Sequence, residues 1–226
     1  MRLVIACAIV AYINGLYGDW LDDDPVAIVE NPDVLCPRGL RGLFDNFWLL
    51  LAHDFWGMPL ASEQSHLSYR PLTTLSFRLQ HALVGFDARS FSRVNVALHA
   101  LVCILFSRCC AAPVLPHESQ RVFAGLLFAL HAVHVEAVTN TVGRAELLSA
   151  ALFFAAVLLY RRLLRPAAAP SFCRTLAVMC GVVGLSGAAM LCKEVRRSLP
   201  CSCVPCVVRT CVRCQSTCAS WVCRWV

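Results

Sequence analysis

The sequence predicts an all-α integral membrane protein, a bundle of about five transmembrane spans. Of its 226 residues, 58% are hydrophobic and only 15% are charged, and the mean hydropathy is +0.64. Soluble domains carry about 25% charged residues, and they need polar side chains to cover their apolar core. The bilayer is therefore the expected solvent, and a cytosolic enzyme is excluded.

Five apolar blocks account for the predicted spans. Met1–Tyr17 carries one charge, Arg2, and shows no small-residue cleavage pattern before the acids that follow, so we interpret it as an uncleaved span. Three of the other four blocks approach the roughly 20 residues that cross the hydrocarbon core, and the fourth reaches that length when it is extended at both ends. They are Val94–Cys110, Val122–Val142, Leu147–Tyr160 (extended from Gly143 to Leu164) and Leu176–Cys192.

Arginines in the short connections predict the orientation of the bundle. Arg108 and Arg121 flank the connection after the second span, and further arginines, from Arg161 to Arg174, flank the one before the fifth. Cytoplasmic loops are enriched in such residues. These loops and the N-terminus are therefore predicted to be cytosolic, and residues 18–93 to be luminal.

The predicted luminal loop, residues 18–93, holds most of the 14 acidic residues and many aromatic ones, a composition unlike solvated coil. Leu40–Asp54 and Leu72–Leu83 have apolar residues at helical spacing, which predicts helices lying along the membrane interface. Within the second of these, Arg78 is interpreted as an interfacial side chain that extends toward the headgroups.

The net charge of +6 does not indicate a nucleic-acid partner. The basic residues are spread along the chain, and no basic stripe interleaved with aromatic residues is present. The expected non-protein partners are membrane lipids.

Three consecutive carboxylates follow the first span: Asp22, Asp23 and Asp24. Like charges this close disfavour full ionisation unless a cation compensates, which suits either a general base or a metal site. A solvated loop that stops the first span from sliding fits the same residues equally well.

A second polar group lies at the end of the third predicted span, where His131, His134 and Glu136 occur together and the two histidines are expected on one helix face. Ionisable residues within spans are costly and usually functional. A divalent ion is one interpretation, and an aqueous cleft lined by hydrogen-bonded side chains is the other.

Two arginines are candidates for binding phosphate, Arg70 and Arg144, the latter accompanied by Glu146. Guanidinium groups match phosphate oxygens and stay charged when partly desolvated. Extension of the side chain to the interface is the alternative for each. Lys193 is expected to mark the luminal boundary of the fifth span.

Seven sequence blocks together resemble one family. In order and spacing, residues 12–194 are similar to the N-terminal half of the transmembrane O-mannosyltransferases that carry tetratricopeptide repeats, the TMTC family. The blocks are GDWLDDDPVAIVENPDV, HDFWG, SHLSYRPLTTLSFRL, FSRVNVALHALV, LLFALHAVHVEAV, VGRAELLSA and MLCKE.

The resemblance implies a GT-C type bundle in the endoplasmic reticulum membrane. Such an enzyme transfers mannose from dolichyl-phosphate mannose, a substrate and not a cofactor, to Ser or Thr of secretory-pathway proteins such as cadherins. No metal cofactor is carried over, although a divalent ion is possible.

The site residues that the resemblance implies fall into three roles. Asp23 would be the catalytic base, with Asp24 and Glu136 assisting it. Arg70 and Arg144 would hold the donor phosphate. The supporting residues would be His131, His134 and Glu146.

The sequence departs from the family pattern at several positions. Asp22 stands at a usually aromatic position, Leu67 replaces a lysine, and Ala132 and Val135 replace a proline and a threonine. The change at Ala132 predicts a different local bend.

The stretch after Glu194 does not follow the family. Residues 195–226 are rich in Cys and Arg, and their two C-x-x-C pairs, which are Cys203 with Cys206 and Cys211 with Cys214, are too close for a zinc ribbon. We therefore expect a truncated form of the enzyme. The alternatives are an inactive membrane fragment from a splice or gene-model product, and a small transporter with a His and Glu proton relay.

Overall fold

The computed structural model describes residues 1–37, 39–111, 114–163 and 172–193. This part of the chain is mainly helical, and it contains no β-strand, only an isolated bridge between His53 and Pro59. The predicted all-α class is confirmed. The predictions for residues 195–226 lie outside the described residues.

Three helices in the described ranges are long and apolar enough to cross a membrane. They are α5 (Ala88–Cys109), a helix over Thr141–Arg161 that consists of a short 3₁₀ turn and α8 (Arg144–Arg161), and α9 (Phe172–Cys192). They match the second, fourth and fifth predicted spans.

The predicted count of five spans is not confirmed, because the helices in the other two blocks are short. The first block contains α1 (Arg2–Val10), followed by a 3₁₀ turn over Ile13–Tyr17. In the third block, α6 (Glu118–Leu130) ends at His131, whose ψ of 128° is extended, and the chain re-enters a helix as α7 (His134–Thr139). The prediction that His131 and His134 share one helix face is therefore wrong.

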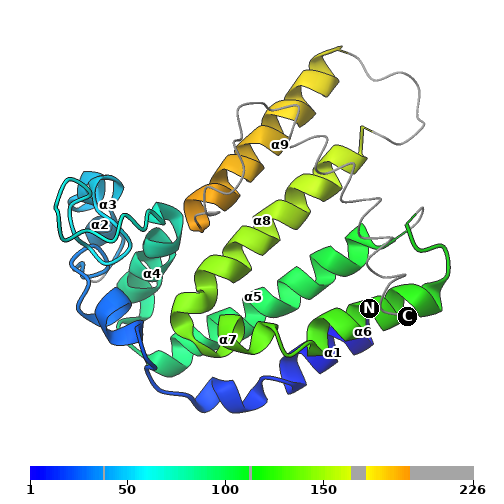
Figure 1. The fold of residues 1–226 in the computed structure, drawn as a ribbon, viewed down its shortest axis with the longest axis horizontal. Coiled ribbons are helices and arrows are strands. Elements are labelled where there is room, and N and C mark those ends of the chain that lie inside the picture. Colours follow the sequence, from blue (N-terminus) through cyan, green and yellow to red (C-terminus); the bar gives the residue numbers. More distant parts are fainter. Residues whose placement is uncertain (38, 112–113, 164–171, 194–226) are drawn as a thin grey trace.

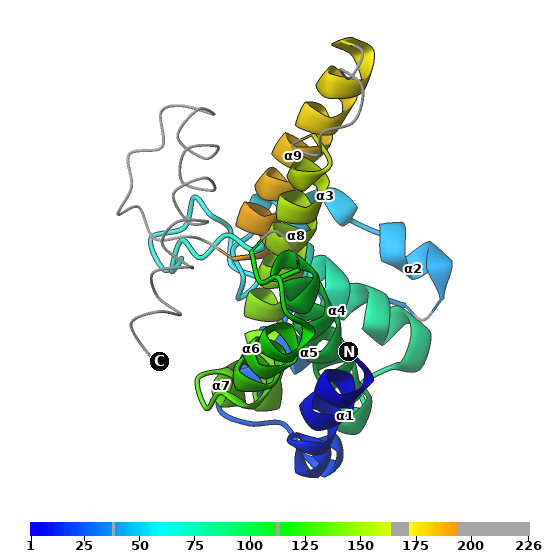
Figure 2. The same ribbon diagram turned by 90° about the vertical axis from the view of Figure 1, so that its right-hand side faces the viewer.

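The helices form a layered bundle in which α8 packs between α9 and α5, and α5 packs against α1 and α6 (Figure 1). The end-on view in Figure 2 shows the same order from α9 through α8 and α5 to α1. Since α5 and α8 point the same way, their C-termini meet, and the Arg161 guanidinium donates to the carbonyls of Arg108, Cys109 and Ala111.

The bundle therefore has two different ends. The acidic end comprises Asp22–Asp24, the N-termini of α4 (Pro71–Val84) and α8, and the C-terminus of α9, where the Thr73 hydroxyl donates to the Cys192 carbonyl. The arginine-rich end comprises the N-termini of α1 and α6 and the C-termini of α5 and α8. Arg108, Arg121 and Arg161 lie at this end, as the sequence predicts, whereas Arg70 and Arg144 lie at the acidic end.

Residues 18–87 fold over the acidic end and share an aromatic cluster with it. This aromatic cluster is made of buried residues that the structure brings together from the loop, α4 and α5, with Trp20 packed against them: Ala27, Ile28, Val34, Phe55, Phe77 and Phe91. Burial of this much apolar surface stabilises the loop against the bundle. The loop is thus a packed part of the fold.

The helix predicted over Leu72–Leu83 is present as α4, which begins at Pro71 and ends at Gly85, whose φ is 77°. Proline at the first helical position and glycine after the last one are favoured for steric reasons. The single helix predicted over Leu40–Asp54 is instead two short helices, α2 (Leu40–Phe44) and α3 (Phe47–Ala52). They are separated at Asn46, whose φ is 52°.

Arg78 is not an interfacial side chain, contrary to its interpretation from the sequence. It is 3% exposed, and its guanidinium donates to the backbone carbonyls of Asp33, Gly42 and Asp45. It therefore joins α4 to two loop segments.

Beside Arg78, the His53 Nδ1 lies 2.9 Å from the Asp33 carboxylate. Burial raises the pKa of Asp33, although His53 opposes that shift.

Candidate active site at the acidic end

The three consecutive aspartates occupy different environments. Asp24 is fully buried, whereas Asp22 and Asp23 are exposed. Asp22 has a φ of 44°, a left-handed conformation that Asp adopts more readily than most residues. The turn at Asp22 and Asp23 places the third carboxylate inside the protein.

The Asp24 carboxylate anchors the loop to the start of α8. It accepts hydrogen bonds from the backbone N–H groups of Val142 at 2.8 Å, Thr141 at 3.3 Å and Leu21 at 3.1 Å. Such charge-assisted bonds offset the cost of burying a carboxylate. Asp24 thus joins segments about 117 residues apart in the chain.

Arg144, the first residue of α8, is 1% exposed and lies behind the same turn. Its Nε donates to the Asn95 Oδ1 at 3.0 Å, and its Nη2 donates to the Phe91 carbonyl at 3.1 Å. The guanidinium carbon lies 4.7 Å from the Phe77 ring centre and 5.1 Å from that of Phe91. Arg144 is buried and already hydrogen-bonded. Its role in binding phosphate stays a prediction.

Asn95 connects these groups, and sequence reasoning did not single it out. Its amide nitrogen donates to the carbonyls of Asn140 at 3.1 Å and Thr141 at 3.4 Å, while its oxygen accepts from Arg144. Asp24 holds the N–H groups of the same turn, so the turn is bound from both sides. A signal was present, because Phe91, Asn95 and His99 recur at intervals of four and therefore share one face of α5.

Arg70 lies at the N-terminus of α4, where its carbonyl accepts from the N–H groups of Thr73 and Thr74. It is half-buried, and its guanidinium carbon lies 4.8 Å from the Phe55 ring centre. Phe55 contacts Phe77 in the aromatic cluster, and Phe77 contacts Arg144. The structure therefore brings Arg70 and Arg144 to one aromatic cluster, with Arg70 the more accessible.

Glu146 and Lys193 form an ion pair at 2.6 Å between the N-terminus of α8 and the C-terminus of α9. Both side chains are substantially exposed, at 53% and 38%. The pair joins the neighbouring helices at the acidic end. Lys193 therefore also links α9 to α8.

His131, His134 and Glu136 do not form one compact group. His131 is exposed and its Nδ1 accepts from the Val133 N–H at 3.1 Å, while Glu136 is exposed in the first turn of α7. The His134 ring contacts Phe128, at 4.5 Å between ring centres, buried His99, at 5.4 Å, and the edge of His131, at 6.4 Å, whereas Glu136 is in none of these contacts. In the described part of the chain, no three His, Cys, Asp or Glu side chains have an arrangement that could hold a metal ion.

Comparison with known proteins places the chain in a family. Protein O-mannosyl-transferase TMTC3 of Homo sapiens is 38% identical over 200 residues, which cover 85% of this chain and 21% of that protein. Protein O-mannosyl-transferase TMTC1 of Mus musculus is 42% identical over 160 residues, 71% of this chain and 16% of the relative. The chain belongs to the TMTC family.

A third TMTC relative, protein O-mannosyl-transferase TMTC2 of Mus musculus, is 44% identical over 149 residues, 66% of this chain and 17% of its own length. The chain thus spans about a fifth or less of the length of these TMTC proteins. No protein-family model matches the chain. No solved structure matches it either.

Proposed function

We propose that this chain forms the catalytic membrane part of a protein O-mannosyltransferase of the endoplasmic reticulum. The TMTC relatives carry that activity in their names. The observation that supports the proposal most is the contrast between two neighbours: Asp24 is buried and fixed by three backbone N–H groups, and Asp23 is exposed next to it.

In the proposed reaction, Asp23 accepts the proton of a Ser or Thr hydroxyl as that oxygen attacks the anomeric carbon of mannose. A carboxylate within hydrogen-bond reach suits this role. Asp24 acts through the backbone, because it fixes the turn that presents Asp23. Glu136, His131 and His134 lie on the neighbouring α6–α7 segment and are assigned a supporting role.

The proposed donor is dolichyl-phosphate mannose, whose phosphate leaves with the polyprenyl chain. The half-buried Arg70 is the first candidate to stabilise that developing charge, since it is more accessible than Arg144. Acceptors would be secretory-pathway proteins such as cadherins. A metal ion is not required, because a guanidinium can offset the charge of a single phosphate.

A chimera tests the proposal: residues 1–193 of this chain replace the matching segment of human TMTC3, and mannose transfer is measured in cells without TMTC activity. The chimera should be active. Asp23→Asn should lower the transfer rate by roughly 10²–10⁴-fold, the contribution of general-base catalysis. Asp22→Asn is the matched control and should retain activity.

An inactive chimera that is folded and correctly inserted would contradict the proposal for this chain and favour a non-catalytic membrane fragment. Full activity of Asp23→Asn would show that the base lies elsewhere. If Asp22→Asn alone abolished transfer, the base would be one residue earlier than assigned.

A further inference from the structure

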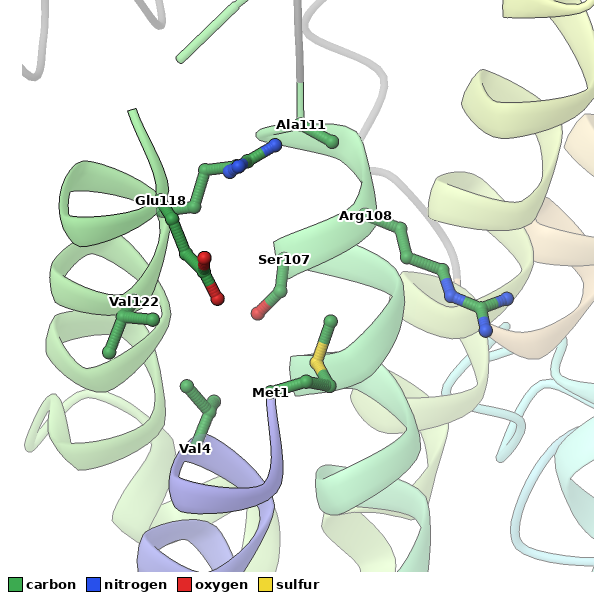
Figure 3. A pocket seen from close by; sticks show the side chains of 8 residues that line it. Met1, Val4, Ser107, Arg108, Ala111, Glu118 and Val122 are labelled. Atoms are coloured by element: carbon green, nitrogen blue, oxygen red, sulfur yellow. The ribbon is translucent and has the colours of Figure 1, made fainter. Parts of the chain in front are cut away.

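A cavity of about 210 Å³ opens at the arginine-rich end, where α1, α5 and α6 meet (Figure 3). It lies at the end opposite the candidate active site and is independent of the proposed function. Its apolar wall is formed by Met1, Val4 and Val122. Its polar groups are contributed by Ser107, Glu118 and Arg121.

The polar side chains that line the cavity still have donors or acceptors that a ligand could use. Figure 3 shows the Glu118 carboxylate and the Ser107 hydroxyl pointing toward each other, and the Arg108 guanidinium pointing away. The Ser107 hydroxyl donates to the Cys103 carbonyl at 2.8 Å, so its oxygen remains an acceptor. Among the described residues, no ion pair joins Glu118 or Arg121 to any other side chain.

Tight helix packing closes the deep end of the cavity. A Cβ atom on Gly125 of α6 would lie 2.8 Å from the Ser107 Oγ and 3.0 Å from a methyl group of Val4. Three helices therefore touch at this level, and the cavity opens only toward the surface. Its shape depends on a glycine that lets the helices approach closely.

Two of the helices that form the cavity, α1 and α6, also carry exposed apolar side chains. Leu3 on α1 is 56% exposed, and Phe123 and Leu127 on α6 are 61% and 56% exposed. A ligand that fills the cavity and covers this surface needs both signs of charge and a hydrocarbon part. A phospholipid has this combination, and a free inorganic ion does not.

We propose that this cavity binds the headgroup of a phospholipid that carries a primary ammonium and a phosphate, of the phosphoethanolamine type. The ammonium donates to Glu118 and Ser107, and the phosphate accepts from Arg121. The acyl chains lie along Leu3, Phe123 and Leu127. Recognition of both charges distinguishes this headgroup from phosphocholine, which has no N–H donor, and from phosphoglycerol, which has no cation.

The test uses the full chain in bilayer discs with equal parts of phosphoethanolamine, phosphocholine and phosphoglycerol lipids, and counts retained lipids by native mass spectrometry. We expect phosphoethanolamine lipid to be retained on the order of tenfold better than phosphocholine lipid, the effect of one charge-assisted hydrogen bond. Equal retention of the three lipids would overturn the proposal.

Three variants locate the site. Glu118→Gln should remove the preference for phosphoethanolamine over phosphocholine lipid, and Glu118→Arg should shift it to phosphoglycerol lipid. Arg121→Gln should lower retention of all three. Arg89→Gln, exposed at the opposite end of α5, is the control and should change nothing. An unchanged preference in Glu118→Gln and Glu118→Arg would show that the lipid binds elsewhere.

Free phosphoethanolamine distinguishes the lipid from its soluble headgroup. Without acyl chains it should fail to displace the retained lipid at millimolar concentration, because the apolar surface supplies much of the binding free energy. Complete displacement would assign the cavity to a soluble ligand and overturn the lipid proposal.

Discussion

The two ends of the bundle differ in whether hydrogen-bonded charged residues are buried there. At the acidic end, Asp24 and Arg144 are buried; Asp24 accepts hydrogen bonds from backbone N–H groups, and Arg144 donates to Asn95 and Phe91. At the arginine-rich end, Arg108 is exposed, and Arg161 donates to carbonyls at the end of a helix. Burying a charge is costly unless its partners are placed for it. The acidic end thus depends on buried groups with specific partners, and the arginine-rich end on contacts at the end of a helix that water can replace.

The largest expected effect concerns which side of the membrane each end of the bundle faces, and it is all-or-none. The chain has no native Asn-x-Ser/Thr acceptor, but Glu63→Asn creates one at the acidic end and His117→Asn creates one at the arginine-rich end. Expressed in cells, the first variant should gain a glycan in the endoplasmic reticulum and the second should not, as shown by a mobility shift that a glycosidase removes. The reverse pattern would invert the orientation.

Removal of the buried guanidinium should have the next largest effect. Arg144→Met leaves the buried Asn95 oxygen and the Phe91 carbonyl without their charged donor, so we expect the free energy of unfolding to fall by about 3 kcal/mol. The measurement is denaturant titration in mixed micelles followed by circular dichroism. Arg93→Met, an exposed arginine of α5, is the control. Equal effects of the two would mean that burial at this end contributes little.

A double-mutant cycle between Asn95→Ala and Arg144→Met sharpens this result. The two residues share a hydrogen bond and the same turn, so their effects on unfolding should be non-additive by about 1–3 kcal/mol. Additive effects would show that Asn95 stabilises the turn through Asn140 and Thr141 alone.

The matching change at the other end should cost less. Arg161→Met removes donors to the carbonyls of Arg108, Cys109 and Ala111, but water can reach the end of a helix and replace them. We expect a loss of about 1 kcal/mol in the same titration. A loss as large as that of Arg144→Met would remove the contrast between the two ends.

The smallest effect is expected at the exposed ion pair of the acidic end. Lys193→Gln removes the bond to Glu146, and exposed pairs contribute about 0.2–1 kcal/mol. The loss of unfolding free energy caused by Lys193→Gln should be smaller at high salt than at low salt, since salt screens exposed charges. A large, salt-independent loss would show that the pair is effectively buried.

Much of the fold could be predicted from the sequence, because it depends on local pattern. The apolar blocks that became α5, α8 and α9 are long and nearly free of charge, and α4 has its proline and glycine at the proper ends. The break at His131 was not predictable from apolar pattern, since hydropathy stays high on both sides of it. The helix ends at this point although Ala132, and not a proline, follows His131.

The candidate site shows where sequence reasoning fails. Asp23 and Asp24 are identical in type and adjacent, but Asp24 is buried against distant Thr141 and Val142 while Asp23 is exposed. Arg78 was misinterpreted for the same reason, because its carbonyl partners lie 33 to 45 residues away. Long-range partners decide burial, and no local pattern encodes them.

The bond between Asp24 and the Thr141 N–H sets an order of events during synthesis. Its two ends are 117 residues apart, and ribosomes add about 5–20 residues per second, so the aspartate emerges roughly 6 to 23 s before its partner. During that interval the carboxylate lacks the backbone donors of Thr141 and Val142. The acidic loop therefore reaches its final conformation only after the N-terminus of α8 has been made, and the geometry around Asp23 cannot form before then.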